Sequence, residues 1–239
     1  MPERQHLWQA LGTAAVVAMA ALLGVTPYVY YLSRVGFAHL LARQAASRAP
    51  AELIQAELLS IGFVVLVAAL VGTLAARRYG LAGIGDRAML RQARNLLVFA
   101  APALGVLSYL LFGRVMAARV PGIYPSSFGW AMGHAVKGAL FDEVVARYGM
   151  MTILCGVVRR PLAANVLQAV FFTVLALLGL SFFGLHPSLS LFFVTSVAAT
   201  FATHLVQGAV FARYGLGAAM IFHLGLGIQY PLHVVLTTL

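Results

Sequence analysis

The segment Phe141-Asp142-Glu143-Val144-Val145-Ala146-Arg147-Tyr148-Gly149 places two acids and an arginine inside an apolar stretch about as long as a membrane is thick. A charge in hydrocarbon is costly, so such residues face a protein interior or a water-filled cavity. Glu143 and Arg147 are four residues apart and would share one helix face, where they can pair. Asp142 is rotated by about 100° and has no cation on its own face within one turn. We therefore expect Asp142 to find partners on a different helix or to take part in chemistry.

The whole chain has 239 residues, of which 62% are hydrophobic and 9% are charged. A soluble domain carries about 25% charged residues, so this composition predicts an integral membrane protein in a lipid bilayer. The apolar runs are too long and too unbroken for barrel strands, so the predicted fold class is all-α, a polytopic transmembrane helical bundle. We count about seven spans, with eight as the alternative: residues 7–32, 52–76, 95–117, 128–157, 162–185, 189–212 and 216–238.

Polar side chains are spread unevenly over these spans. The first three spans carry little polar chemistry at depth, and we interpret residues 1–127 as N-terminal scaffold spans. Gly72 and Ala76 are four apart and would let another helix approach closely. Acids, histidines, threonines and glutamines gather from residue 128 onward, so residues 128–239 are interpreted as the working bundle. Together the two parts are expected to form one integral membrane domain.

The net charge of +10 comes almost entirely from arginine. If the chain crosses the membrane seven times, nine arginines lie on the same face of the membrane as the N-terminus and five lie on the opposite face. This excess favours a cytoplasmic N-terminus. We expect the plasma (inner) membrane as the location. Nucleic acid is not an expected partner, because the arginines are scattered between apolar runs instead of forming one basic module.

Two acids on one helix and histidines on others suit hydrolysis. A carboxylate can activate water as a general base while a histidine orients it, and a second histidine can stabilise the oxyanion formed at a carbonyl. The same residue types also hold zinc, although the helical H-E-x-x-H signature is absent. We expect no cofactor, with a divalent metal such as zinc as the alternative.

These residues resemble the motifs of a known family, the CPBP intramembrane proteases, which include CAAX prenyl endopeptidases and bacteriocin-processing proteins. Residues 142–147 look like the family's E-E-x-x-x-R, and Phe182 with His186 matches its F-x-x-x-H. Residues 208–223, which end at His223, resemble the segment before the third motif, H-x-x-x-(Asn or Asp). The motifs occur in the family's order, and the likeness covers roughly residues 128 to 238.

The resemblance implies a seven- or eight-helix membrane protease that cleaves a membrane-associated peptide or a prenylated protein tail. Carried over by position, Asp142 is the general base that activates water, with Glu143 and Arg147 as a supporting ion pair. His186 assists with the water, and His223 binds the oxyanion. Lipidated or peptide substrates are the implied partners.

Two departures from the family pattern leave an alternative open. The first acid is Asp142 instead of glutamate, and Gly227 stands where the third motif has asparagine or aspartate. Loss of one oxyanion donor can cost roughly 10²–10³ in rate. Gln229 could substitute only if its helix is distorted. The alternative is a catalytically weakened or inactive relative that acts as a membrane partner or immunity-type protein. A proton-coupled transporter is a third and more remote class.

The remaining polar residues carry plainer expectations. We predict that His134, His204 and His233 form hydrogen bonds between helices. Lys137 is five residues before Asp142, about 140° around a regular helix, and is expected not to pair with it. His186 lies near the outer end of its span, so Pro187 is expected to mark a helix end that lies below the membrane surface.

Overall fold

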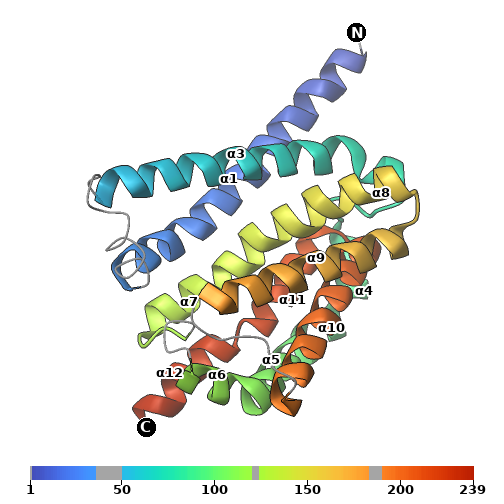
Figure 1. Cartoon of the computed structure of the whole chain (residues 1–239). Helices are drawn as coiled ribbons and strands as arrows, with labels where there is room; N and C mark the ends of the chain where they lie inside the picture. The colour runs from blue at the N-terminus through green and yellow to red at the C-terminus, as the bar shows by residue number, and fades with distance from the viewer. Residues whose placement is uncertain (1, 36–49, 120–123, 183–189) are drawn as a thin grey trace.

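A computed structural model of the chain describes residues 2–35, 50–119, 124–182 and 190–239. Within these ranges every regular element is a helix and no strand is present, which confirms the predicted all-α class (Figure 1). Six helices in the described part are long and apolar enough to cross a membrane, which confirms the predicted helical membrane bundle. They cover His6–Tyr31, Ile54–Ala75, Leu96–Arg119, Pro161–Gly179, Leu191–Tyr214 and Leu216–Thr238.

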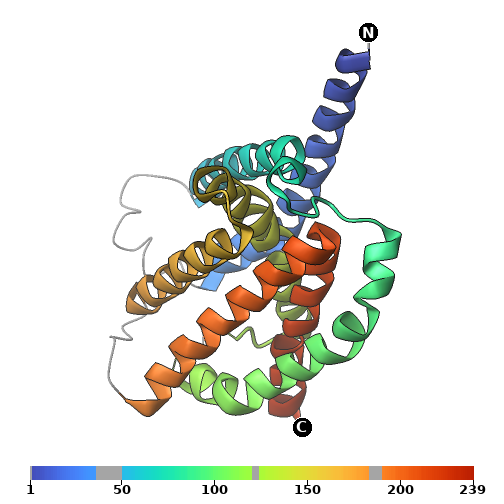
Figure 2. The same ribbon diagram turned by 90° about the vertical axis from the view of Figure 1, so that its right-hand side faces the viewer.

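The N-terminal half contains two long helices that pack against each other, α1 (Pro2–Val35) and α3 (Pro50–Ala75). The first turns of α1 project beyond the other helices (Figures 1 and 2). The short helices η1 (Arg77–Tyr79) and α4 (Arg87–Gln92) follow α3. The next span alternates between π and α geometry as η2 (Leu96–Ala100), α5 (Ala101–Ser108), η3 (Tyr109–Gly113) and α6 (Arg114–Arg119).

The C-terminal half begins with one long helical run that changes geometry along its length. Its parts are α7 (Phe128–Lys137), η5 (Gly138–Asp142), η6 (Val144–Met151) and α8 (Thr152–Val158), of which η5 and η6 are π-helical. Four further helices follow: α9 (Pro161–Phe182), α10 (Leu191–Tyr214), α11 (Leu216–Leu226) and α12 (Gln229–Thr238). Ser127 caps the start of α7, because its side chain accepts a hydrogen bond from Trp130 N.

The run from α7 to α8 corresponds to the predicted fourth span, but its charged residues set it apart from the six apolar helices. It occupies the middle of the bundle, where its parts contact α1, α3, α9, α10 and α11 (Figure 1). Its π-helical part is largely buried, including Arg147. This position follows from the cost of charge in lipid, because a helix with four acidic or basic side chains, Lys137, Asp142, Glu143 and Arg147, must be shielded by its neighbours.

Small residues allow α3 to lie directly against the central helical run. A side chain at Gly72 would overlap the ring of Tyr148, whose hydroxyl donates to Thr73 at 3.1 Å. A methyl at Gly149 would in turn lie 2.5 Å from Cβ of Ala68. The predicted close approach at Gly72 is confirmed, and it joins the N-terminal helices to the core of the C-terminal half.

Replacing Gly72 with alanine is expected to destabilise the folded protein by about 1–3 kcal/mol, because the added methyl overpacks against Tyr148. Gly62→Ala on the same helix is the matched control, since a methyl there would meet only Leu22, at 3.6 Å. The measurement is the free energy of unfolding of both variants in mixed micelles with increasing dodecyl sulfate. Equal stability of the two variants would contradict the close contact at Gly72.

One end of the bundle is strongly basic. Backbone hydrogen bonds from Leu216 N to Gly83 O (2.8 Å) and from Gly217 N to Ile84 O (3.1 Å) fasten the loop after α3 to the turn between α10 and α11. Eight exposed arginines of the described chain lie in or beside these connections: Arg77, Arg78, Arg87, Arg91, Arg94, Arg159, Arg160 and Arg213. Asp86, the N-cap of α4, is the acid among them.

Candidate functional site

The π-helical turn Gly138–Asp142 decides how the polar residues of the central helix face one another. A π-turn holds about one residue more than an α-turn, so residues five apart come to lie on the same side. Lys137 is thereby aligned with Asp142, and Gly138 with Glu143. These two alignments place one ion pair and one histidine contact on adjacent parts of the helix.

Lys137 pairs with Asp142, so the prediction that these two side chains do not pair is wrong. Nζ of Lys137 lies 2.8 Å from Oδ1 and 2.9 Å from Oδ2 of Asp142. The regular-helix angle used for the prediction does not apply, because the turn between the two residues is π-helical. Of the two alternatives expected for Asp142, a partner on a different helix is not the one found, because Lys137 lies on the same helical run, and a part in chemistry stays a prediction. The Lys137 and Asp142 side chains remain 20% and 31% exposed, so they form the accessible part of the site.

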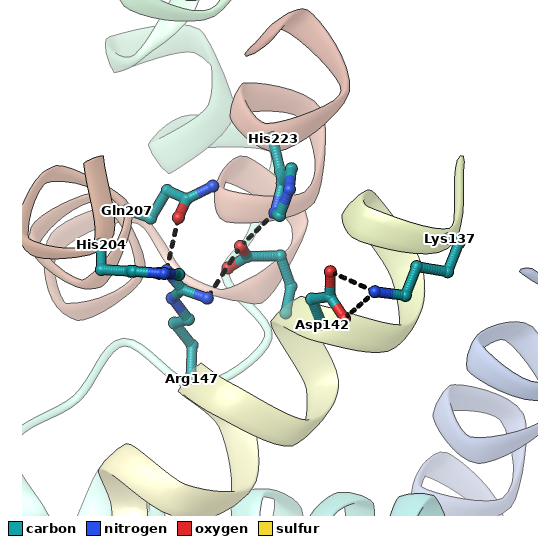
Figure 3. A network of polar contacts seen from close by, with 7 residues as sticks. Lys137, Asp142, Arg147, His204, Gln207 and His223 are labelled. Atoms are coloured by element: carbon teal, nitrogen blue, oxygen red, sulfur yellow. Dashed lines mark hydrogen bonds and ion pairs between the residues drawn. The ribbon is translucent and has the colours of Figure 1, made fainter. Parts of the chain in front are cut away.

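Glu143 and Arg147 form the predicted ion pair, with Oε1 of Glu143 3.4 Å from Nη1 of Arg147. Both side chains are fully buried, and the charges therefore need further partners. Oε1 of Glu143 also lies 2.7 Å from Nδ1 of His223 on α11. Figure 3 shows this network, with His223 reaching it from another helix and Asp142 beside it, joined to Lys137.

The contact with Glu143 orients the ring of His223. A carboxylate paired with an arginine accepts hydrogen bonds and does not donate them, so Nδ1 of His223 carries the proton. The other ring nitrogen, Nε2, lies over Gly138, where a side-chain methyl would be only 2.6 Å away. Glycine at this position therefore makes room for the histidine.

Helix α10 supplies two residues that complete the Arg147 site. Nη2 of Arg147 lies 2.8 Å from Nδ1 of His204 and also donates to Oε1 of Gln207. His204 thus forms the interhelical hydrogen bond that was predicted for it. Neither residue was predicted as part of the site, although a polar pair three apart on an apolar helix lies on one face and signals a buried polar partner. In Figure 3 these two residues and the Lys137–Asp142 pair lie on opposite sides of Arg147.

Two atoms of this cluster, Oε2 of Glu143 and Nε of Arg147, are buried without a hydrogen-bond partner among the described residues. Buried polar atoms of native proteins are almost always hydrogen-bonded. The two atoms are therefore suited to hold water or a polar group of a bound molecule. The cluster thus combines a fixed charge pair with capacity for a polar ligand.

His233 and His134 contact aromatic residues on other helices. Nδ1 of His233 lies 3.0 Å from the Tyr109 hydroxyl, which confirms its predicted interhelical hydrogen bond. His134 packs against the rings of Tyr28 and Tyr230, and its Nδ1 has no hydrogen-bond partner in the described part of the chain. The predicted hydrogen bond is therefore not found at that nitrogen.

The segment after His223 lacks the third-motif donor for a steric reason. Helix α11 ends at Leu226 and α12 begins at Gln229, so the distortion that Gln229 would need is present. Gln229 nevertheless accepts a hydrogen bond from the Tyr124 hydroxyl at 3.1 Å. A methyl at Gly227 would lie 2.7 Å from Cβ of Ala135 on α7, so α7 would have to move before a larger residue could fit.

His186 and Pro187 lie outside the described residues, so the F-x-x-x-H position and the depth of the helix end remain predictions. In the described ranges no three His, Cys, Asp or Glu side chains are grouped as metal ligands. The structure therefore brings together Glu143, Arg147 and His223, and places Asp142 beside them. Comparisons with protein-family models, curated proteins and solved structures found no match to this chain.

Proposed function

We propose that this protein is an intramembrane endopeptidase of the CPBP type, which cleaves a membrane-associated peptide or a prenylated protein tail with water as the nucleophile. The observation that supports this proposal is a partly exposed histidine, His223, bound to the buried carboxylate of Glu143, beside a second, accessible carboxylate, Asp142. The set lies inside an apolar helical bundle. Burying such groups there is costly, and ionisable residues at such positions typically mark a functional site. The three ordered motifs of the sequence add to this support.

In the proposed reaction Asp142 is the general base. Its carboxylate retains lone pairs beyond those engaged by Lys137, so it can accept a proton from a water molecule. The resulting hydroxide attacks the peptide carbonyl carbon to form a tetrahedral intermediate. The intermediate collapses as the C–N bond breaks, and the proton held by Asp142 passes to the leaving amine nitrogen. Glu143 accepts the Nδ1 hydrogen bond of His223 and orients its ring, so that Nε2 can donate to the oxyanion. Arg147 holds Glu143 in place, and His186 is proposed to orient the water.

We further propose that the N-terminus is cytoplasmic and that the protein resides in the plasma (inner) membrane. The eight arginines at one end of the bundle support this orientation, because basic loops favour the cytoplasmic side. Helix α1 begins near the end at which α3 finishes, so its first residues belong to the same side as η1 (Figure 1). A peptide bond close to the membrane would then be the target.

Replacing Asp142 with asparagine is expected to lower peptidase activity by at least about 100-fold, because the amide cannot accept the proton of water. Activity is measured in liposomes with fluorogenic peptides that carry a farnesylated cysteine and with the same peptides unmodified. Asp86→Asn is the matched control, because asparagine keeps the N-cap of α4 far from the site. Undiminished cleavage by a folded Asp142→Asn variant would exclude this role.

A non-catalytic relative that acts as a membrane partner is the second candidate. It is favoured by Gly227, whose place against Ala135 leaves no room for the family's second oxyanion donor. It is also favoured by the bidentate Lys137–Asp142 pair, which neutralises the proposed base. Under this reading the polar cluster maintains the fold, and the wild-type protein cleaves none of the peptides in the same assay.

A further inference from the structure

A cavity of about 750 Å³ lies apart from the acids, between α5–α6 on one side and α9–α10 on the other. Its wall runs along α10 from Phe192, in the first turn, to His204, near the Arg147 network. Twelve residues of helix cover about 18 Å, close to half of the roughly 30 Å hydrocarbon core. The cavity therefore has the length of one leaflet.

The cavity wall is even less polar than its residue types suggest. Seven hydroxyl-bearing residues line it, and four of them donate the hydroxyl hydrogen to a backbone carbonyl of their own helix: Thr173, Ser196, Thr200 and Thr203. A fifth, Tyr124, donates its hydroxyl hydrogen to Gln229. Hydroxyls engaged in this way present mainly carbon to their neighbours. The remaining lining is dominated by leucine, phenylalanine, alanine and valine, so the space suits a hydrocarbon chain.

Arg119 is the charged side chain among the described lining residues. It lies at the end of α6, with its guanidinium 5.1 Å from the ring centre of Phe192. No carboxylate of the described chain pairs with it. An unpaired cation at the helix ends, above an apolar space one leaflet deep, matches an anionic head group joined to an acyl chain.

We propose that this cavity binds an anionic phospholipid, with one acyl chain along α10 and the phosphate at Arg119. The proposal does not depend on the proposed peptidase activity, because none of the acids is involved. It also gives a partner to α10, which has a smaller buried share than any of the other five apolar helices of the described chain. The lipid chain fills the side of α10 that faces α5 and α6.

The test is native mass spectrometry of the detergent-solubilised full chain, titrated with phosphatidylglycerol or with phosphatidylcholine of the same acyl chains. Wild type is expected to retain phosphatidylglycerol more strongly. Arg119→Gln should weaken phosphatidylglycerol binding about fivefold and leave phosphatidylcholine unchanged. Arg114→Gln is the matched control, because Arg114 lies on the same helix and does not line the cavity.

A second pair of variants tests the acyl-chain site. Ala199 lines the cavity, whereas its neighbour Ala198 is exposed and does not. Ala199→Trp should abolish retention of both lipids, and Ala198→Trp should leave it intact. Equal retention by the two tryptophan variants, or equal phosphatidylglycerol binding by Arg119→Gln and Arg114→Gln, would overturn the proposal. Loss of binding together with unchanged peptide cleavage would support it.

Discussion

Arg147→Met is expected to lower the midpoint of thermal unfolding by roughly 10 °C. Methionine fills most of the space but leaves the Glu143 carboxylate buried without its cation. Removing one member of a buried ion pair costs about 3–5 kcal/mol, and each kcal/mol shifts the midpoint by about 2–4 °C in a protein of this size. His204 and Gln207 also lose their donor, which adds to the effect. The measurement is the unfolding midpoint of the purified protein in detergent.

Two further variants separate a buried charge from general damage. Arg114→Met removes an exposed arginine from α6 and should leave the midpoint within about 2 °C of wild type. Glu143→Met combined with Arg147→Met removes both charges, so it should recover at least half of the loss. If the double variant is less stable than Arg147→Met alone, the uncompensated Glu143 charge is not the cause.

The sequence predicted the parts of this molecule that depend on composition and on regular helical spacing. Apolar runs required an all-α membrane bundle, and the spacing of four between Glu143 and Arg147 required a shared face. The ion pair is present at 3.4 Å. Gly72 on α3, four residues before Ala76, likewise indicated a close helix contact, which Tyr148 makes at Gly72.

The prediction that was wrong for Lys137 and Asp142 has one physical cause, a π-helical turn. A π-turn inserts one residue into the helical repeat, and no residue type in the turn Gly138–Asp142 predicts this geometry from the sequence. The extra residue moves Lys137 onto the Asp142 face and Gly138 onto the Glu143 face, where His223 is received. Contacts from distant segments were also hidden, since nothing local shows that Arg147 meets α10 or that Ala135 restricts Gly227.

The second large effect concerns Glu143 and His223, which are expected to act as one unit in catalysis. His223→Asn should lower peptidase activity by about 10²–10³, because asparagine cannot supply the cationic donor to the oxyanion. Glu143→Gln should cost a similar factor, since a neutral amide holds the Nδ1–H of His223 less strongly than a carboxylate does. When both changes are combined, the activity should be no lower than that of the less active single variant, because each change removes the same function.

The control for this double-mutant experiment is His233→Asn. It removes a histidine whose described hydrogen bond is to Tyr109, so activity should stay near that of wild type. Activity is measured in liposomes with the same fluorogenic peptides, and folding is checked by the thermal midpoint. Multiplicative losses in the double variant would show that the two residues act separately, against the orientation role of Glu143. If His223→Asn instead lowers the midpoint and no peptide is cleaved by any variant or by wild type, the 2.7 Å contact is structural and the non-catalytic candidate stands.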